Sequence, residues 1–200
     1  MPDLPVEVQR ACEHGTEHED DGTATLKQNV GSYLRRRFPG CTISHIQIRQ
    51  TGLYTLPPPD NYLKCTPDLY FTFKKDGIAQ PIINVEIKCP WYGEDGKTAH
   101  CDRNCRPDYI LQTHLEMKAL DCSETLLVSW GPETTRVFPI KFSSELFQDM
   151  SEWAKRWFTS DSCPTLGQTP CVERIKEATQ TIAAEASKRA VTWTSCVYKR

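Results

Sequence analysis

Two carboxylates and a lysine lie at the ends of two predicted strands. Asp68 directly follows Pro67, and Glu86 and Lys88 lie two residues apart in an apolar run. Side chains two apart on a strand project from the same face, so Glu86 and Lys88 point the same way. Carboxylate oxygens suit a hard cation such as Mg²⁺, and a lysine beside them can orient or deprotonate water or offset charge on a phosphate. Glu-x-Lys alone favours a structural ion pair, whereas Pro-Asp ahead of it favours a metal site.

The two strands form a predicted hairpin. Residues 69–73 alternate apolar and polar side chains, which is the period of a half-buried strand. Residues 74–77, Lys-Lys-Asp-Gly, supply a turn in which the glycine can adopt a positive φ. Residues 82–87 form a second and more apolar run. A hairpin with its turn near residues 75–80 would bring Asp68 close to Glu86 and Lys88.

These residues resemble a known family. Pro67-Asp68, followed by Val-Glu-Ile-Lys-Cys-Pro at 85–90, resembles the PD-(D/E)xK nuclease core and, more narrowly, the YqaJ-like viral recombinase group, relatives of phage lambda exonuclease. The resemblance covers residues 11–158. It implies an α/β fold with a restriction-endonuclease-like core, a mixed central β-sheet flanked by α-helices. It also implies a Mg²⁺-dependent deoxyribonuclease, with Mn²⁺ as an alternative metal, acting as an exonuclease in recombination or repair.

The resemblance implies a role for each motif residue. Asp68 and Glu86, with the backbone carbonyl of Ile87, would hold the metal ion, and Lys88 would position or activate water. The metal would lower the pKa of the attacking water and stabilise the leaving oxygen.

Two further segments match the family. Gly-Thr-Glu-His-Glu at 15–19 is similar to its Gly-x-x-x-Glu segment, which implies that Glu19 completes a second metal site, with Glu17 as the alternative. Acidic residues also favour a helix N-terminus without any metal. Residues 109–117 are similar to the family's Tyr-x-x-Gln-x-x-x-x-Met helix, which implies that Gln112 assists near the water or phosphate.

Net charge limits how DNA could be bound. The chain carries a formal charge of −2, so DNA binding must depend on local basic clusters. Arg35, Arg36 and Arg37 close a predicted helix and are candidates for phosphate contacts, as is Lys64. Cations at a helix C-terminus are also favoured by the helix dipole alone.

The cysteines favour an intracellular protein. Ten cysteines occur without a signal-peptide hydrophobic region in residues 1–22, so we expect reduced thiols and a nuclear or cytoplasmic location rather than secretion. No stretch approaches the roughly 20 apolar residues of a membrane span, so no membrane partner is expected. Cys89, His100, Cys101 and Cys105 provide an alternative, structural zinc site. A second functional hypothesis is therefore an inactive nuclease-derived module that binds nucleic acid or a protein partner.

The remaining segments complete one predicted domain. Helices are expected over 11–38 and 108–120 and after residue 143, and strands over 42–49, 124–130 and 136–142. Residues 159–200 lie outside the resemblance. We predict them to be an extension with an amphipathic helix over 172–190 and an unassigned role.

Overall fold

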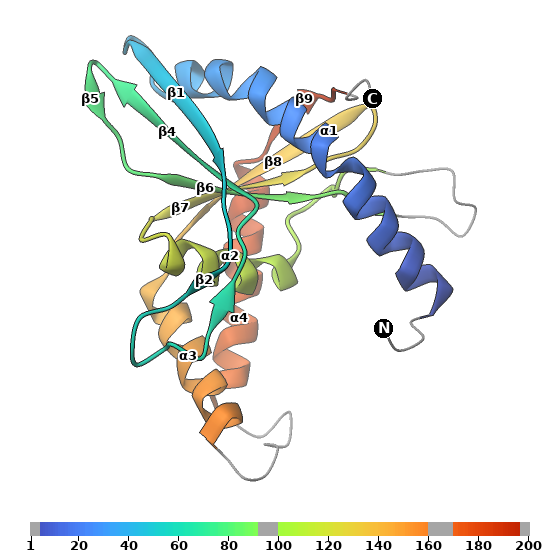
Figure 1. Ribbon diagram of the computed structural model, residues 1–200, viewed down its shortest axis with the longest axis vertical. Coiled ribbons are helices and arrows are strands. Elements are labelled where there is room, and N and C mark those ends of the chain that lie inside the picture. Colours follow the sequence, from blue (N-terminus) through green and yellow to red (C-terminus); the bar gives the residue numbers. More distant parts are fainter. Residues whose placement is uncertain (1–4, 92–99, 160–169, 197–200) are drawn as a thin grey trace.

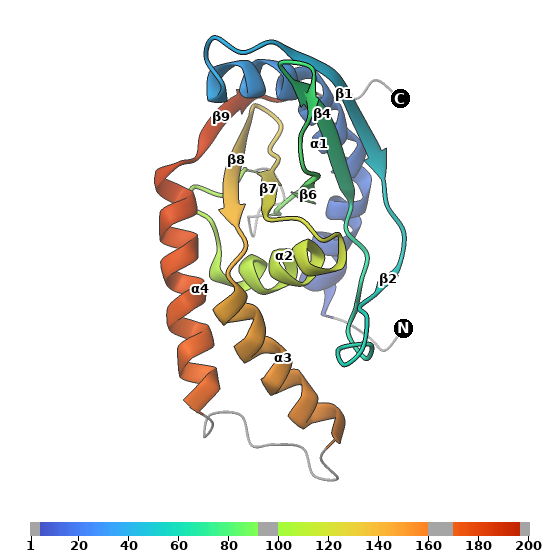
Figure 2. The same ribbon diagram turned by 90° about the vertical axis from the view of Figure 1, so that its left-hand side faces the viewer.

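The protein folds as a mixed α/β structure around one curled sheet. The computed structural model describes residues 5–91, 100–159 and 170–196. In chain order the elements are α1 (Val6–Arg37), β1 (Ile43–Gln50), β2 (Tyr54–Thr55), β3 (Lys64–Cys65), β4 (Leu69–Lys75), β5 (Ile78–Ala79), β6 (Ile83–Lys88), α2 (Pro107–Ala119), β7 (Glu124–Ser129), β8 (Thr134–Lys141), α3 (Ser144–Thr159), α4 (Pro170–Lys188) and β9 (Val191–Thr194). Helix α1 covers one face of the sheet, and α2, α3 and α4 lie on the other (Figure 1, Figure 2). The predicted mixed sheet flanked by helices is confirmed.

The sheet is mixed because one connection crosses over it. Its strand order is β1-β4-β6-β7-β8-β9, with β5 paired to β4. Strands β6 and β7 run parallel, whereas the other pairs described in this sheet are antiparallel. Parallel neighbours need a crossover connection, and α2 lies in it. This crossover places α2 against the face of β6 that carries Glu86.

The predicted hairpin is confirmed, with a one-residue shift in register between its turn and the site. Asp76 and Gly77 adopt positive φ values of 52° and 80°, as Asp-Gly does in tight hairpin turns. Strand β4 then pairs antiparallel with β6, with Leu69 opposite Val85. One residue further along the same register, Asp68 lies opposite Glu86.

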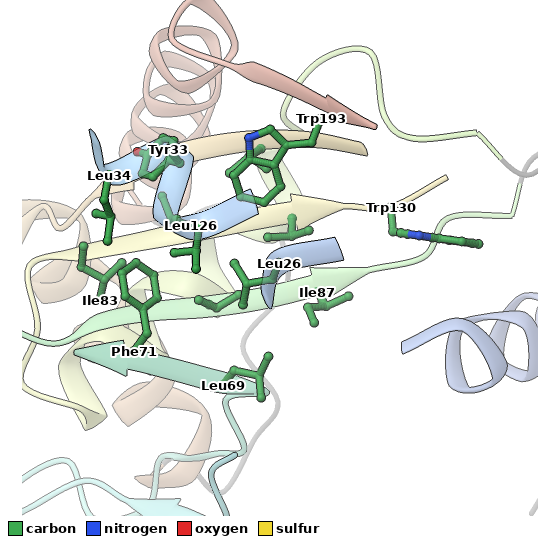
Figure 3. Packing of buried hydrophobic residues seen from close by; sticks show 14 of the residues in the cluster. Leu26, Tyr33, Leu34, Leu69, Phe71, Ile83, Ile87, Leu126, Trp130 and Trp193 are labelled. Atoms are coloured by element: carbon green, nitrogen blue, oxygen red, sulfur yellow. The ribbon is translucent and has the colours of Figure 1, made fainter. Parts of the chain in front are cut away.

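Helix α1 packs closely on β6 because a glycine faces the strand. Apolar residues at helical spacing, including Leu26, Val30 and Leu34, fill the core on this side. Figure 3 shows Leu26 and Leu34 of α1 against side chains of the sheet, among them Ile87. A Cβ added to Gly22 would lie 2.5 Å from Ile87 Cγ2, so only glycine permits this approach. The contact fixes the N-terminal half of α1 over the end of β6.

The C-terminal segment belongs to the same fold. The predicted helix over 172–190 is observed as α4, at 170–188. Strand β9 then pairs with β8, and Trp193, which is 3% exposed, joins the core on the α1 side of the sheet. Residues 170–194 therefore complete the sheet and its core, where the sequence suggested an extension beyond residue 158.

Candidate functional site

A cleft of about 670 Å³ opens at the carboxyl end of β6. The N-terminal half of α1 forms one wall, and the start of α2 forms another. The cleft is lined by Glu19 from α1, Tyr109 from α2, and Asp68, Glu86 and Lys88 from the hairpin. The structure thus brings the three motif residues to one place.

Glu86 is the centre of the polar contacts in this cleft. Its side chain is buried, with 2% exposure. The Oε1 atom accepts hydrogen bonds from Lys88 Nζ at 2.6 Å and from Gln112 Nε2 at 2.5 Å. The Oε2 atom is also buried and has no hydrogen-bond partner among the residues that the structure describes. A buried acceptor without a donor is costly, so this oxygen is suited to a cation.

Asp68 lies beside Glu86 and is held by the backbone. Its Oδ2 atom accepts the N–H of Ile87 at 2.7 Å. The C=O of a strand residue faces the same edge as its N–H, so the Ile87 carbonyl lies on the Asp68 side as well. Burial, followed by the charge of Glu86, raises the pKa of Asp68 to about 8. Burial and Glu116 raise the pKa of Glu86 to about 7. The positive charge of Lys88 therefore does not fully compensate the two carboxyls.

Lys88 is an ammonium ion in this arrangement. Burial by itself lowers its pKa, but the carboxylates of Glu86 and Asp68 outweigh that effect and raise the pKa above its ordinary value. The Nζ atom also lies 5.5 Å from the centre of the Tyr109 ring. Lys88 is thus equipped to orient water and offset negative charge, rather than to accept a proton.

Two buried residues behind Glu86 were not predicted from the sequence. Asn84 Nδ2 donates to Glu116 Oε2 at 2.9 Å, and Gln112 Nε2 donates to Glu116 Oε1 at 2.8 Å. Burial raises the pKa of Glu116. Spacing alone contained a signal: Asn84 shares a strand face with Glu86 and Lys88, and Glu116 lies one helical turn after Gln112.

The acidic residues of α1 take different positions. Glu19 is exposed and lines the cleft, and its charge contributes to the raised pKa of Asp68. Glu17 is exposed and is not among the residues that line the cleft. Across the described ranges, no three His, Cys, Asp or Glu side chains are grouped as ready-made metal ligands. The second metal site at Glu19 stays a prediction.

The predicted phosphate-binding arginines lie away from the cleft. Arg35 is 16 residues from Glu19 along α1, which corresponds to about 24 Å at 1.5 Å per residue. Arg37 forms a two-point ion pair with Glu124 at the start of β7, including an Nη2–Oε2 contact of 2.7 Å. Arg37 therefore ties α1 to the sheet. In the cleft itself, Arg106 and Lys88 are the basic residues among the described lining.

The proposed zinc ligands are not brought together. Cys89 is buried in the core on the α1 side, whereas Cys105 is buried in the core on the α2 side. Cys101 Sγ lies 3.5 Å from Thr134 Oγ1, and His100 is exposed. The nine cysteines within the described ranges are free, and Cys163 lies outside them. The sheet between Cys89 and Cys105 prevents a shared metal.

No protein-family model, curated protein or solved structure matches this chain. None of the helices in the described ranges is long and apolar enough to cross a membrane. The function must therefore be argued from the site itself.

Proposed function

We propose that this protein is a metal-dependent nuclease that hydrolyses phosphodiester bonds in DNA. The observation that supports this most directly is the convergence of Asp68, Glu86 and Lys88 at the carboxyl end of β6, in an open cleft. The resemblance of their motif to the YqaJ-like group of PD-(D/E)xK nucleases adds the proposal of a restriction-endonuclease-like core. An exonuclease acting in recombination or repair is the corresponding activity.

The residues present fit a hard divalent cation. Asp68, Glu86 and the carbonyl of Ile87 offer oxygen ligands, which Mg²⁺ and Mn²⁺ prefer. Glu86 Oε2 has no hydrogen-bond partner among the described residues, and the pKa values of both carboxyls are raised although Lys88 is close. Both observations support the proposal that a further positive charge binds here. A bound metal ion would supply a more acidic water and stabilise charge on the leaving oxygen.

Other side chains would hold the substrate and the carboxylates. Lys88 places an ammonium group beside Glu86, where it can attract a phosphate and orient a water molecule. Gln112 fixes the carboxylate of Glu86 through a hydrogen bond of 2.5 Å. Arg106 pairs with Asp108 at 2.7 Å in an exposed ion pair and lies 5.0 Å from the Tyr109 ring centre. It would provide a second cation in the cleft for the phosphate backbone.

The decisive experiment is cleavage of end-labelled linear DNA and of circular DNA by the purified protein, with Mg²⁺ or with EDTA. We expect degradation of linear DNA only with the metal. Glu86→Gln and Lys88→Ala should each reduce the rate by at least about 100-fold, the scale of losing a preorganised electrostatic group. Matched surface variants, Glu145→Gln and Lys141→Ala, should cleave as the wild type does. Wild-type activity in the Glu86→Gln protein would refute the assignment.

Metal binding gives a readout that does not depend on cleavage. Mg²⁺ should raise the wild-type unfolding temperature, because a ligand that binds only the folded state stabilises it. Asp68→Asn should abolish that rise. DNA binding without cleavage in any divalent metal would instead favour the inactive nucleic-acid-binding module.

A further inference from the structure

An apolar pocket of about 550 Å³ lies between β3, α2, α3 and α4, beside the cleft. Its apolar walls come from three helices, with Leu111 and Leu115 in α2, Met150 and Trp153 in α3, and Ile175 in α4. Small-ligand sites have volumes of roughly 300–1,000 Å³ and are mostly apolar, with a few polar groups that orient the ligand. The hydrolytic chemistry proposed above does not use this pocket.

Two of the segments that line the pocket also carry residues of the candidate site. Residues 63–66 line the pocket, and Asp68 follows two residues later. Gln112 also lines the pocket, and its amide donates the 2.5 Å hydrogen bond to Glu86. Glu116 lines the pocket as well and is held by that same amide at 2.8 Å. A molecule in the pocket would therefore be positioned relative to the carboxylates of Asp68 and Glu86.

The chemistry of the lining favours a flat ring with polar edges and an attached anion. Trp153 supplies an aromatic side chain on which a ring can stack. Thr66 and Gln112 supply polar side chains among the apolar walls, whereas the carboxylate of Glu116 is fully buried and accepts hydrogen bonds from Asn84 and Gln112. Lys64 is exposed and is the one cation among the described lining residues. Nucleobases have such faces and edges, and every nucleotide carries a phosphate; stacking on aromatic side chains is a general mode of single-strand binding.

We propose that this pocket binds an unstacked base of the nucleic-acid strand, with a phosphate of that strand near Lys64. The proposal rests on the proposed function, because the base belongs to the strand that is cut. Its mechanistic value is positional: a base held by the segments that carry Asp68 and Gln112 fixes the neighbouring phosphate against the carboxylates. Orientation of this kind contributes strongly to catalysis.

Binding is tested with 2-aminopurine deoxyribonucleoside monophosphate in EDTA, where no metal-dependent cleavage occurs. The fluorescence of this base decreases when it stacks. We expect wild-type protein to quench it, and Trp153→Leu and the pocket-filling variant Ala154→Phe to bind about tenfold more weakly or worse. Trp157→Leu is the matched control, because this indole lies 5.7 Å from the Trp153 ring but does not line the pocket.

The control variant should bind like the wild type. Equal affinity in Ala154→Phe would overturn the proposal, and so would equal weakening in all three variants. An apolar dye that binds the wild type but is not displaced by the nucleotide would also overturn it. Urea unfolding midpoints show whether each variant remains folded.

Cleavage kinetics separate this proposal from the nuclease assignment. Substrates with a normal or an abasic terminal residue should differ in KM for the wild type and not for Ala154→Phe. If the wild type cleaves both equally well, the pocket assignment fails and the nuclease assignment stands. If the wild type binds the probe but cleaves no DNA, the nuclease assignment fails and the pocket remains a nucleotide site.

Discussion

The raised pKa of Asp68 makes the stability of the protein depend on pH. Burial and the charge of Glu86 raise this pKa to about 8, whereas an aspartate in an unfolded chain has a pKa of about 3.9. Between these values the folded state binds more protons, so the free energy of unfolding falls as pH rises. At about 1.36 kcal/mol per pH unit, the loss from Asp68 is roughly 4 kcal/mol between pH 5 and 9, of which about 1.4 kcal/mol falls between pH 7 and 9.

Asp68→Asn should remove this loss and leave the backbone contact intact. The asparagine side-chain oxygen can still accept the N–H of Ile87 but carries no charge. The pKa of Glu86 is about 7, so the ionisation of Glu86 lowers the free energy of unfolding mainly as the pH rises toward 7. The difference due to Asp68 is therefore cleanest above pH 7. Between pH 7 and pH 9, the free energy of unfolding of the variant should rise by about 1.4 kcal/mol relative to that of the wild type.

Urea unfolding at pH 5, 7 and 9, in EDTA and a reducing agent, measures this difference. Asp20→Asn is the matched control, since it removes an exposed carboxyl from the same molecule and should follow the wild-type curve. Parallel wild-type and Asp68→Asn curves over the whole range would show that Asp68 is not buried against Glu86. Mg²⁺ should reduce the pH dependence of the wild type, since a cation favours the ionised carboxyls.

Two further predictions concern α1 and the substrate cleft. Gly22→Ala should destabilise the protein by about 1–3 kcal/mol, because the new Cβ would lie 2.5 Å from Ile87 Cγ2 in β6. Gly15→Ala is the control: apart from the adjacent backbone, its Cβ would have no described atom within 4 Å, so it should be neutral or stabilising by up to about 1 kcal/mol. Equal unfolding midpoints for the two variants would contradict the close approach of α1. For duplex DNA, Arg106→Ala should reduce the slope of log K against log salt by about 0.9, and Arg36→Ala should leave it unchanged. The reverse result in a filter-binding titration would place the DNA path at the other end of α1.

Local patterns were sufficient to predict the hairpin and the pair of motif residues within it. The alternation of residues 69–73 specifies which face of β4 is buried, and the Asp-Gly turn specifies where the chain reverses. Neither pattern predicts the one-residue shift between the turn pair Lys74–Ala79 and the site pair Leu69–Val85, and that shift places Asp68 opposite Glu86. Helical spacing likewise predicted Gln112 on a helix, because amphipathic periodicity depends only on neighbouring residues.

Contacts between distant segments could not be read in this way. Glu116 joins the site only because one face of α2 packs on the face of β6 that carries Asn84 and Glu86. Arg37 lies 87 residues from Glu124 along the chain. The ion pair between them forms only because the end of α1 packs beside the start of β7. Sequence spacing does not encode which faces meet, since many pairings bury similar apolar area.

The sequence by itself determined the strand pair and the proximity of Asp68, Glu86 and Lys88. The tertiary structure decided that Cys89 and Cys105 lie in different cores, that β9 completes the sheet, and that an apolar pocket adjoins the carboxylates. The physical reason is the separation along the chain over which each kind of interaction acts. Turns and periodicity act between residues close in the chain, whereas burial and the pKa values it shifts depend on the packing of segments that the chain brings together only on folding.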